Sequence, residues 1–368
     1  MHTTLPRLCG AVLVLALPLA AQRARPLGPS DFTTEVALDR MPVLSQGRTG
    51  SCWCFATTSF LESEVKRLKG ETVDLSEMYG VHAAWREKSE VFVRLHGKAQ
   101  LGQGGLSHDL IAVAREHGVM PASAYSGLRE GRAEHDHEEL EKILQTLLPI
   151  YATGKSPSPE WRDAVGGVID AYLGKPPATF EVGGRTVTPQ QYAREVLALP
   201  LDDYVELMSF DSEGFGTTGE LLVPDNWMRD SNYWNVPIQE LLDNVDHALR
   251  AGYSIALDCD VSEATNDQGR GLMRLSPQME KHEITDELRQ LQFDSRETTD
   301  DHLMHIVGIA KDKDGGVWYV VKNSWGNVGP FEGNVMMSRA YLALKTLAIM
   351  VHKDGTLEST RARFVPAK

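Results

Sequence analysis

The sequence predicts an α+β fold of two halves with a largely helical insertion between them. Three observations support this fold class. Trp53, Ala56 and Phe60 recur at helical spacing and form one apolar stripe, which indicates a helix in the first half. Two strand-like runs, residues 302–310 and 317–323, flank a turn rich in Asp and Gly and predict a β-hairpin in the second half. The stretch between the halves is acidic, contains several prolines and has its own helical patterns.

The patterns divide the chain into six segments. They are a signal peptide at residues 1–21, an irregular lead-in at 22–40, the helical half at 41–126, the insertion at 127–234, the β-rich half at 235–354 and a C-terminal tail at 355–368. Further helices are expected near residues 77–93, 108–117, 139–148, 161–173 and 237–250. A short hairpin is expected over residues 179–188, turning at Gly183-Gly184, and a strand over residues 253–257.

The N-terminus has the pattern of an export signal. Arg7 supplies a positive start, residues 8–19 are mostly apolar, and Ala20 and Ala21 offer a small-residue cleavage site. The apolar run is too short to span a bilayer as a stable helix. We therefore expect export to a periplasm or to the outside, and no membrane span in the mature chain.

Composition excludes several classes of protein. The 368 residues are 42% hydrophobic and 24% charged, which is ordinary for a globular chain, and the net charge of −14 argues against a nucleic-acid-binding surface. No metal site and no cofactor are expected. Without the signal peptide, three cysteines remain, an odd number that does not suit a disulfide scaffold. We interpret them as one reactive thiol, Cys52, and two buried small hydrophobes, Cys54 and Cys259.

The start of the first predicted helix has the features of a thiol nucleophile and its oxyanion donors. Cys52 is expected at the helix N-terminus, where unsatisfied N–H groups and the helix dipole favour a thiolate. Acyl transfer also needs hydrogen-bond donors for the developing oxyanion. The backbone N–H of Cys52 and the side-chain amide of Gln46, six residues earlier, are the candidates.

The predicted C-terminal hairpin supplies a base and a group that orients it. Antiparallel pairing places the start of the first strand beside the end of the second, so a histidine there approaches Asn323. His302 and His305 both compete for the base, and the strand pattern does not choose between them. Asn323 would hold the imidazole in the useful tautomer, and Trp325 would shield that hydrogen bond from water.

Three motifs together resemble the papain-type cysteine peptidases. They are Gln46 with Gly50-Ser51-Cys52-Trp53, the spacing from His302 to Gly308, and Asn323-Ser324-Trp325-Gly326. The resemblance implies a papain-like two-lobed fold with the site in a groove between the lobes, and it selects His302 as the base. It also implies that Gly104 and Gly105 pair with the substrate backbone, and that the carbonyl of Asp301 lies near the leaving-group side.

Other segments resemble the branch that contains aminopeptidase C and bleomycin hydrolase. They include Leu75-Ser76-Glu77-Met78-Tyr79, Leu201-Asp202-Asp203-Tyr204 and Cys259-Asp260-Val261. This resemblance implies an aminopeptidase with a peptide substrate, commonly assembled as a hexamer. Members of the branch place their extreme C-terminus in the cleft to select free N-termini.

Other functions use similar residues. A cysteine endopeptidase would have the same catalytic set. A transglutaminase or another thiol acyltransferase usually has Asp as its third residue, so Asn323 counts against it. An idle peptide-binding module would be expected to have lost a catalytic residue, and none is missing.

Two groups of polar residues lie outside these motifs. Residues 135–138, His-Asp-His-Glu, are typical of a metal site or of a solvated acidic helix start, and we favour the second interpretation. Asp258 and Asp260 flank Cys259 at a strand end. Binding of a substrate amine and a structural role both remain open for them.

Overall fold

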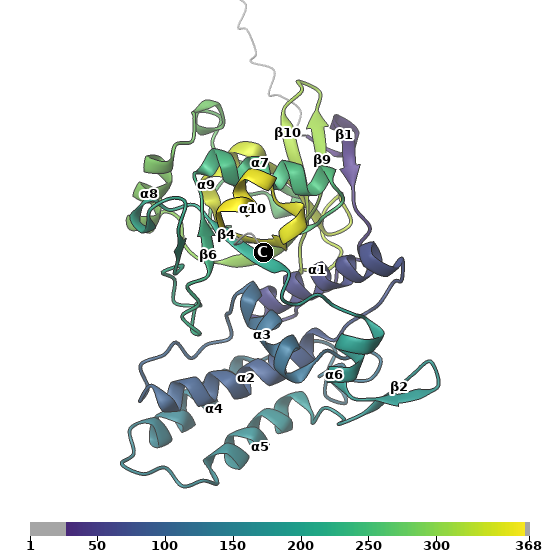
Figure 1. The fold of residues 1–368 in the computed structure, drawn as a ribbon, viewed down its shortest axis with the longest axis vertical. Helices are drawn as coiled ribbons and strands as arrows, with labels where there is room; N and C mark the ends of the chain where they lie inside the picture. The colour runs from purple at the N-terminus through teal and green to yellow at the C-terminus, as the bar shows by residue number, and fades with distance from the viewer. Residues whose placement is uncertain (1–26, 365–368) are drawn as a thin grey trace, which may run out of the picture.

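The computed structural model describes residues 27–364 and has two parts, a bundle of helices and a sheet covered by further helices (Figure 1). The predicted signal peptide and residues 365–368 of the predicted tail lie outside the described residues. The observed mixture of helices and sheet confirms the predicted α+β class. Among the described residues, no helix is both long enough and apolar enough to cross a membrane.

The helical part is built around α1, which begins at the predicted nucleophile. Its helices are α1 (Cys52–Lys69), α2 (Glu77–Arg94), α3 (Ser107–His117), α4 (Glu138–Ala152) and α5 (Trp161–Leu173). α1 is buried from Cys52 to Val65, because α2 and α3 pack on it from one side and the sheet strands β7 and β9 pack on it from the other. Gly70 ends the helix in a left-handed conformation and donates its N–H to the carbonyl of Lys66. The nucleophile helix is therefore a rigid element between the two parts.

A ten-stranded sheet forms the second part of the described chain. Nine of its strands follow the order β5-β6-β4-β12-β7-β9-β10-β11-β8, and β1 pairs with β9 beside them. Their bounds are β1 (Phe32–Ala37), β4 (Tyr204–Met208), β5 (Thr218–Gly219), β6 (Tyr233–Asn235), β7 (Ile255–Cys259), β8 (Leu272–Met273), β9 (His302–Asp312), β10 (Val317–Lys322), β11 (Asn334–Ser338) and β12 (Thr346–His352). Four helices belong to this part, namely α7 (Ile238–Arg250), α8 (Asp286–Asp294), α9 (Arg339–Lys345) and α10 (Glu358–Phe364).

The expectation of an irregular lead-in was wrong for β1. Phe32–Ala37 pairs antiparallel with β9, and the two prolines that disfavour regular structure in this segment, Pro26 and Pro29, precede the strand in the sequence. Gly308 of β9 shows why the pairing needs a glycine, since a Cβ at this position would lie 2.3 Å from the carbonyl oxygen of Val36. The lead-in therefore stabilises, through β1, the strand that carries the candidate base.

The two predicted hairpins are confirmed. β9 and β10 pair antiparallel, with Lys322 opposite His305, so the start of β9 and the residue after β10 meet at one end. β2 (Phe180–Val182) and β3 (Arg185–Val187) form the smaller hairpin around Gly183-Gly184. This hairpin is followed by the short helix α6 (Pro189–Gln191), which adjoins α3.

Residues 127–234 contribute to both parts of the structure. Their α4 and α5 pack with α2, whereas their β4, β5 and β6 extend the sheet. One hydrophobic core joins the helices to the inner face of the sheet, and a second lies between the outer face and α7 and α9. The boundaries proposed for this insertion remain a prediction.

Candidate active site

Cys52 is the first residue of α1, and its side chain lies close to the start of β9. The backbone N–H of Leu303, the residue after His302, lies near the sulfur and favours its thiolate form. As the first residue of α1, Cys52 has a backbone N–H with no intrahelical acceptor. The side chain is buried, with 8% of the residue exposed. The fold thus brings the thiol, a free N–H donor and the His302 backbone together from segments far apart in the sequence.

His302 is held by Asn323 and Trp325. Nε2 of the imidazole lies 2.8 Å from Oδ1 of Asn323, which also accepts the backbone N–H of Ser324. An amide oxygen only accepts hydrogen bonds, so Nε2 carries the proton and Nδ1 keeps a lone pair. The Trp325 ring stacks on the imidazole at a centroid distance of 4.7 Å. Nδ1 is therefore the nitrogen that can take a proton from a thiol.

His305, the competing histidine, faces the core. Its Nδ1 lies 2.9 Å from the hydroxyl of Ser59 on α1, and its ring packs edge-on against Phe60. The residue is fully buried. His305 therefore belongs to the packing between α1 and the sheet, and the hydrogen bond to Asn323 is made by His302.

The amide of Gln46 is fixed by two hydrogen bonds. Its Oε1 accepts the hydroxyl of Ser324, and its Nε2 donates to the carbonyl of Thr49, each at 2.6 Å. These bonds set which end of the amide carries the donors, and they leave the second N–H of Nε2 available. The backbone N–H of Cys52 and this side-chain N–H are the two donors that an oxyanion site requires.

Burial disfavours the charged form of both reacting groups and shifts their pKa values accordingly. Burial raises the pKa of the Cys52 thiol to about 12, and the charges of Asp300 and Asp225 add to the rise. Burial lowers the pKa of the His302 ring to about 4, and the bond to Asn323 partly opposes this. Transfer of the proton from thiol to ring creates both charges together, so the pair avoids the cost of an isolated charge.

Gly104 and Gly105 lie beside the nucleophile loop. The preceding residue, Gln103, accepts the backbone N–H of Gly50 with its side chain and the indole N–H of Trp53 with its carbonyl. A Cβ at Gly104 would lie 1.8 Å from Oδ2 of Asp225, so the carboxylate of Asp225 covers this glycine. Asp301 is exposed beside His302, and its carboxylate accepts hydrogen bonds from Thr299 and Val261.

Sequence reasoning missed several of these partners. No local motif specifies the approach of the Leu303 N–H to the thiol or the hydrogen bond from the Ser324 hydroxyl to Gln46, because each joins segments far apart in the sequence. It also missed the position of Asp225, which nothing in its surrounding sequence marks. The acidic pair Asp300-Asp301 stands directly before His302 in the sequence, but a role in the site was predicted for Asp301 alone.

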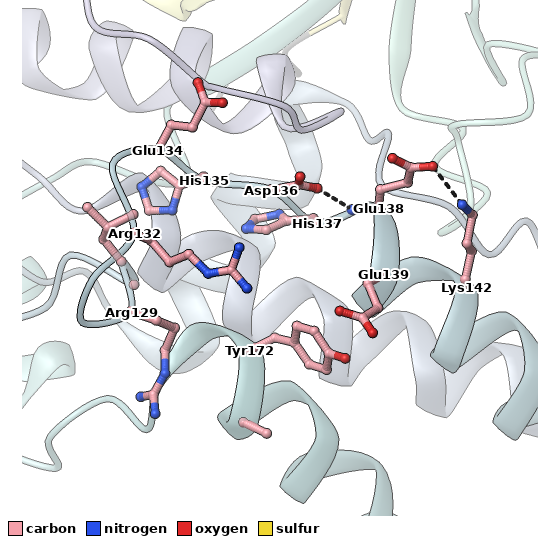
Figure 2. A pocket seen from close by; sticks show the side chains of 13 residues that line it. Arg129, Arg132, Glu134, His135, Asp136, His137, Glu138, Glu139, Lys142 and Tyr172 are labelled. Carbon is pink, nitrogen blue, oxygen red and sulfur yellow. Dashed lines mark hydrogen bonds and ion pairs between the residues drawn. The ribbon is translucent and has the colours of Figure 1, made fainter.

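A separate cavity of about 610 Å³ lies in the helical part, and Figure 2 shows the side chains that line it. It contains residues 135–138, which we had expected to be a solvated helix start. That expectation was wrong for His137, which is buried before α4 and whose ring nitrogens have no partner within residues 27–364. Burial lowers the pKa of this ring to about 4. Within residues 27–364, no group of three or more acidic, His or Cys side chains is placed to hold a metal ion.

Comparison with known sequences identifies the family. The sequence model described as Peptidase C1-like family matches residues 168–365, more than half of the chain. The chain belongs to the Peptidase C1-like family. The model described as Papain family cysteine protease matches residues 31–147, which hold α1 and its N-terminus. The chain is thus a cysteine-type peptidase, and the predicted resemblance to papain-like peptidases is confirmed.

Individual relatives cover most of the chain. It is 22% identical to Aminopeptidase C of Streptococcus thermophilus and 24% identical to Aminopeptidase G of Lactobacillus delbrueckii subsp. lactis. Each alignment covers 88% of this chain and 83% of the relative. The crystal structure of PepW from Lactobacillus rhamnosis superposes with a TM-score of 0.70 at 20% identity, covering 90% of this chain and 84% of that one. The papain-like fold is confirmed by this likeness.

Proposed function

We propose that this peptidase is an aminopeptidase that cleaves through a thioester on Cys52. The observation that carries the thiol mechanism is the junction at the start of β9. There the N–H of Leu303 lies near the Cys52 sulfur and favours its thiolate form, while the adjacent His302 ring is oriented by Asn323 at 2.8 Å. The names of the relatives, aminopeptidases C and G, support the choice of an aminopeptidase over an endopeptidase.

Each residue has a role in the proposed reaction. Cys52 attacks the peptide carbonyl while its proton passes to Nδ1 of His302, and the Cys52 N–H and the Gln46 amide stabilise the oxyanion. The protonated ring then gives this proton to the departing amine, which leaves a thioester. Water, deprotonated by the same ring, hydrolyses the thioester and restores the thiol. Asn323 keeps the ring oriented throughout.

Cleavage of a mixed peptide library tests this proposal. The purified protein is incubated with free and N-acetylated peptides, and the cut positions are read by mass spectrometry. We expect loss of residues from free N-termini only, and no cleavage by Cys52→Ala. Internal cuts in acetylated peptides would instead show an endopeptidase. Cleavage that persists in Cys52→Ala would refute the thiol mechanism.

Export and assembly are part of the proposal. The apolar N-terminal run supports removal of residues 1–21 and export to a periplasm or beyond. Sequencing the N-terminus of the protein from its natural cells tests this. A homo-oligomer, with a hexamer as the family expectation, remains a prediction that light scattering of the purified protein checks.

A further inference from the structure

Three aspartates from separate segments lie around the nucleophile. Asp258 is on β7, where it pairs with Leu303, the residue whose N–H lies near the Cys52 sulfur. Asp300 lies two residues before His302, and its carboxyl is within hydrogen-bonding reach of that of Asp258. Asp225, in the loop between β5 and β6, covers Gly104. We call Asp225, Asp258 and Asp300 the aspartate trio.

The side chain of Asp258 points toward the helical part, and no hydrogen-bond donor of residues 27–364 reaches its carboxylate. Leu257 and Cys259 face the core under α7, so strand alternation turns Asp258 toward the helical part. The residue is 4% exposed, and within residues 27–364 neither carboxylate oxygen receives an N–H or O–H in the deprotonated state. Asp258 and Asp300 can therefore bond to one another only by sharing a proton. Burial and the charges of Asp300 and Asp225 raise the pKa of Asp258. Burial and the charge of Asp225 raise the pKa of Asp300 to about 8, and the hydrogen bond with Asp258 partly opposes this rise.

Two basic side chains near the trio, Lys88 and His108, already have polar partners. Lys88 is buried, and its ammonium donates to the carbonyls of Gly102 and Gly104, where it attracts Asp225. Asp225 also accepts a hydrogen bond from the side chain of Gln100. His108 is paired with Glu206 at 3.0 Å. No salt bridge to Asp258 or Asp300 is formed within residues 27–364, so the trio retains acceptor capacity for a further cation.

The position of the trio indicates which cation fits. A scissile carbonyl placed on the Cys52 sulfur has the α-nitrogen of the same residue only about 2.5 Å from the carbonyl carbon. That nitrogen therefore stays close to the sulfur, which lies within electrostatic reach of Asp300 and Asp225. An ammonium brings one positive charge and three N–H donors to carboxylates that lack donors. Asp225 and Asp300 are half-buried, so the region is open to solvent.

We propose that the aspartate trio is an ammonium-binding subsite that holds a substrate ammonium group next to the scissile bond. The group is the free α-ammonium of the first residue or the side-chain ammonium of a lysine there. In the first case the subsite selects free N-termini without help from the C-terminal tail. This inference deepens the proposed aminopeptidase function and rests on it.

A bound ammonium would also affect the nucleophile. Asp300 and Asp225 raise the pKa of the Cys52 thiol, and a cation between them offsets their charge. Binding of a substrate amine therefore lowers the cost of forming the thiolate. The subsite would couple recognition of the amine to activation of the thiol.

Kinetics with four substrates test the subsite. Coumarin amides of alanine and lysine are compared with and without an N-acetyl group, using Asp258→Asn, Asp300→Asn and the exposed control Asp294→Asn. If the trio holds the α-ammonium, each trio variant lowers kcat/KM for both free amides at least tenfold, mainly through KM, and the acetylated amides stay uncleaved. A loss confined to free lysine amide would assign the subsite to the side chain. Unchanged selectivity in both trio variants, with loss of selectivity on deletion of residues 365–368, would overturn the proposal.

A second measurement separates the subsite from the proposed function. The pH midpoint of Cys52 alkylation by iodoacetamide is followed by mass spectrometry with L-alaninol, which has an α-ammonium and no scissile carbonyl. We expect the midpoint to fall by at least about half a unit in the natural protein. No change is expected in Asp300→Asn or with N-acetylalaninol. A shift in a protein that cleaves no peptide would keep the subsite and reject the aminopeptidase. Cleavage of free peptides with no shift and no effect of the trio variants would reject the subsite alone.

Discussion

Nε2 of His302 lies 2.8 Å from Oδ1 of Asn323 across the open end of the β9–β10 hairpin. The bond joins residues 21 positions apart and fixes the ring nitrogen that faces away from Asn323. Because the Leu303 N–H of β9 also lies near the Cys52 sulfur, one hairpin end brings the base and its orienting amide to the nucleophile. The first three predictions test this arrangement.

Replacing the two histidines separately distinguishes the base from the core residue. His302→Gln removes the only proposed proton acceptor, so we expect kcat/KM to fall at least about a thousandfold with little change in melting temperature. His305→Gln breaks buried packing and the bond to Ser59, so we expect a lower melting temperature and kcat/KM within about tenfold of the natural protein. Peptide kinetics and thermal melts of both variants check this. The reverse pattern would make His305 the base.

Removing the orienting amide affects turnover more than binding. In Asn323→Ala the ring loses the acceptor that fixes its tautomer, and small misplacements of a catalytic group cost about a hundredfold. We expect kcat to fall by roughly that factor, with KM changed less than threefold. Asn323→Gln keeps the amide at the wrong length and serves as the matched control. A normal kcat in Asn323→Ala would show that Trp325 stacking alone orients the ring.

Gln46 is expected to act on the transition state. Gln46→Ala removes one of the two oxyanion donors, a loss that typically costs about 100-fold to 1,000-fold in kcat. Ser324→Ala keeps this donor and removes only the hydrogen bond to Oε1 of Gln46, so we expect kcat to fall by no more than about tenfold. Steady-state kinetics of the two variants check the order. Equal effects would indicate that Gln46 is only a structural support for the loop.

The sequence predicted the site where short-range patterns specify geometry. Helical spacing located α1, and turn residues located the hairpin that joins His302 to Asn323, although the choice of His302 over His305 needed the family resemblance. β1 was missed because an edge strand carries a weak pattern and is stabilised by β9, which is distant in sequence. The sequence raised amine binding for Asp258, but it did not place Asp225 and Asp300 beside it, since the three carboxyls meet only after the sheet and the loop before β6 are assembled.

The trio leaves a distinct mark on stability. The pKa of Asp300 is about 8 in the folded protein, against about 3.8 for an ordinary aspartate, so the folded state holds this proton more tightly. Its stabilising contribution is present below about pH 4 and is lost as pH rises through about 8. Asp300→Asn removes this dependence. We therefore expect its melting temperature relative to the natural protein to increase from pH 5 to pH 9.

Thermal melts across this pH range provide the measurement. Other buried carboxyls with raised pKa values, such as Glu62 and Glu77, titrate in both proteins, so the difference between the two curves isolates the trio. Asp294→Asn, at an exposed position on α8, should show a difference that does not vary with pH. A constant difference for Asp300→Asn as well would mean that its carboxyl is ionised in the fold. In that case burial and the charge of Asp225 would not raise the pKa of Asp300.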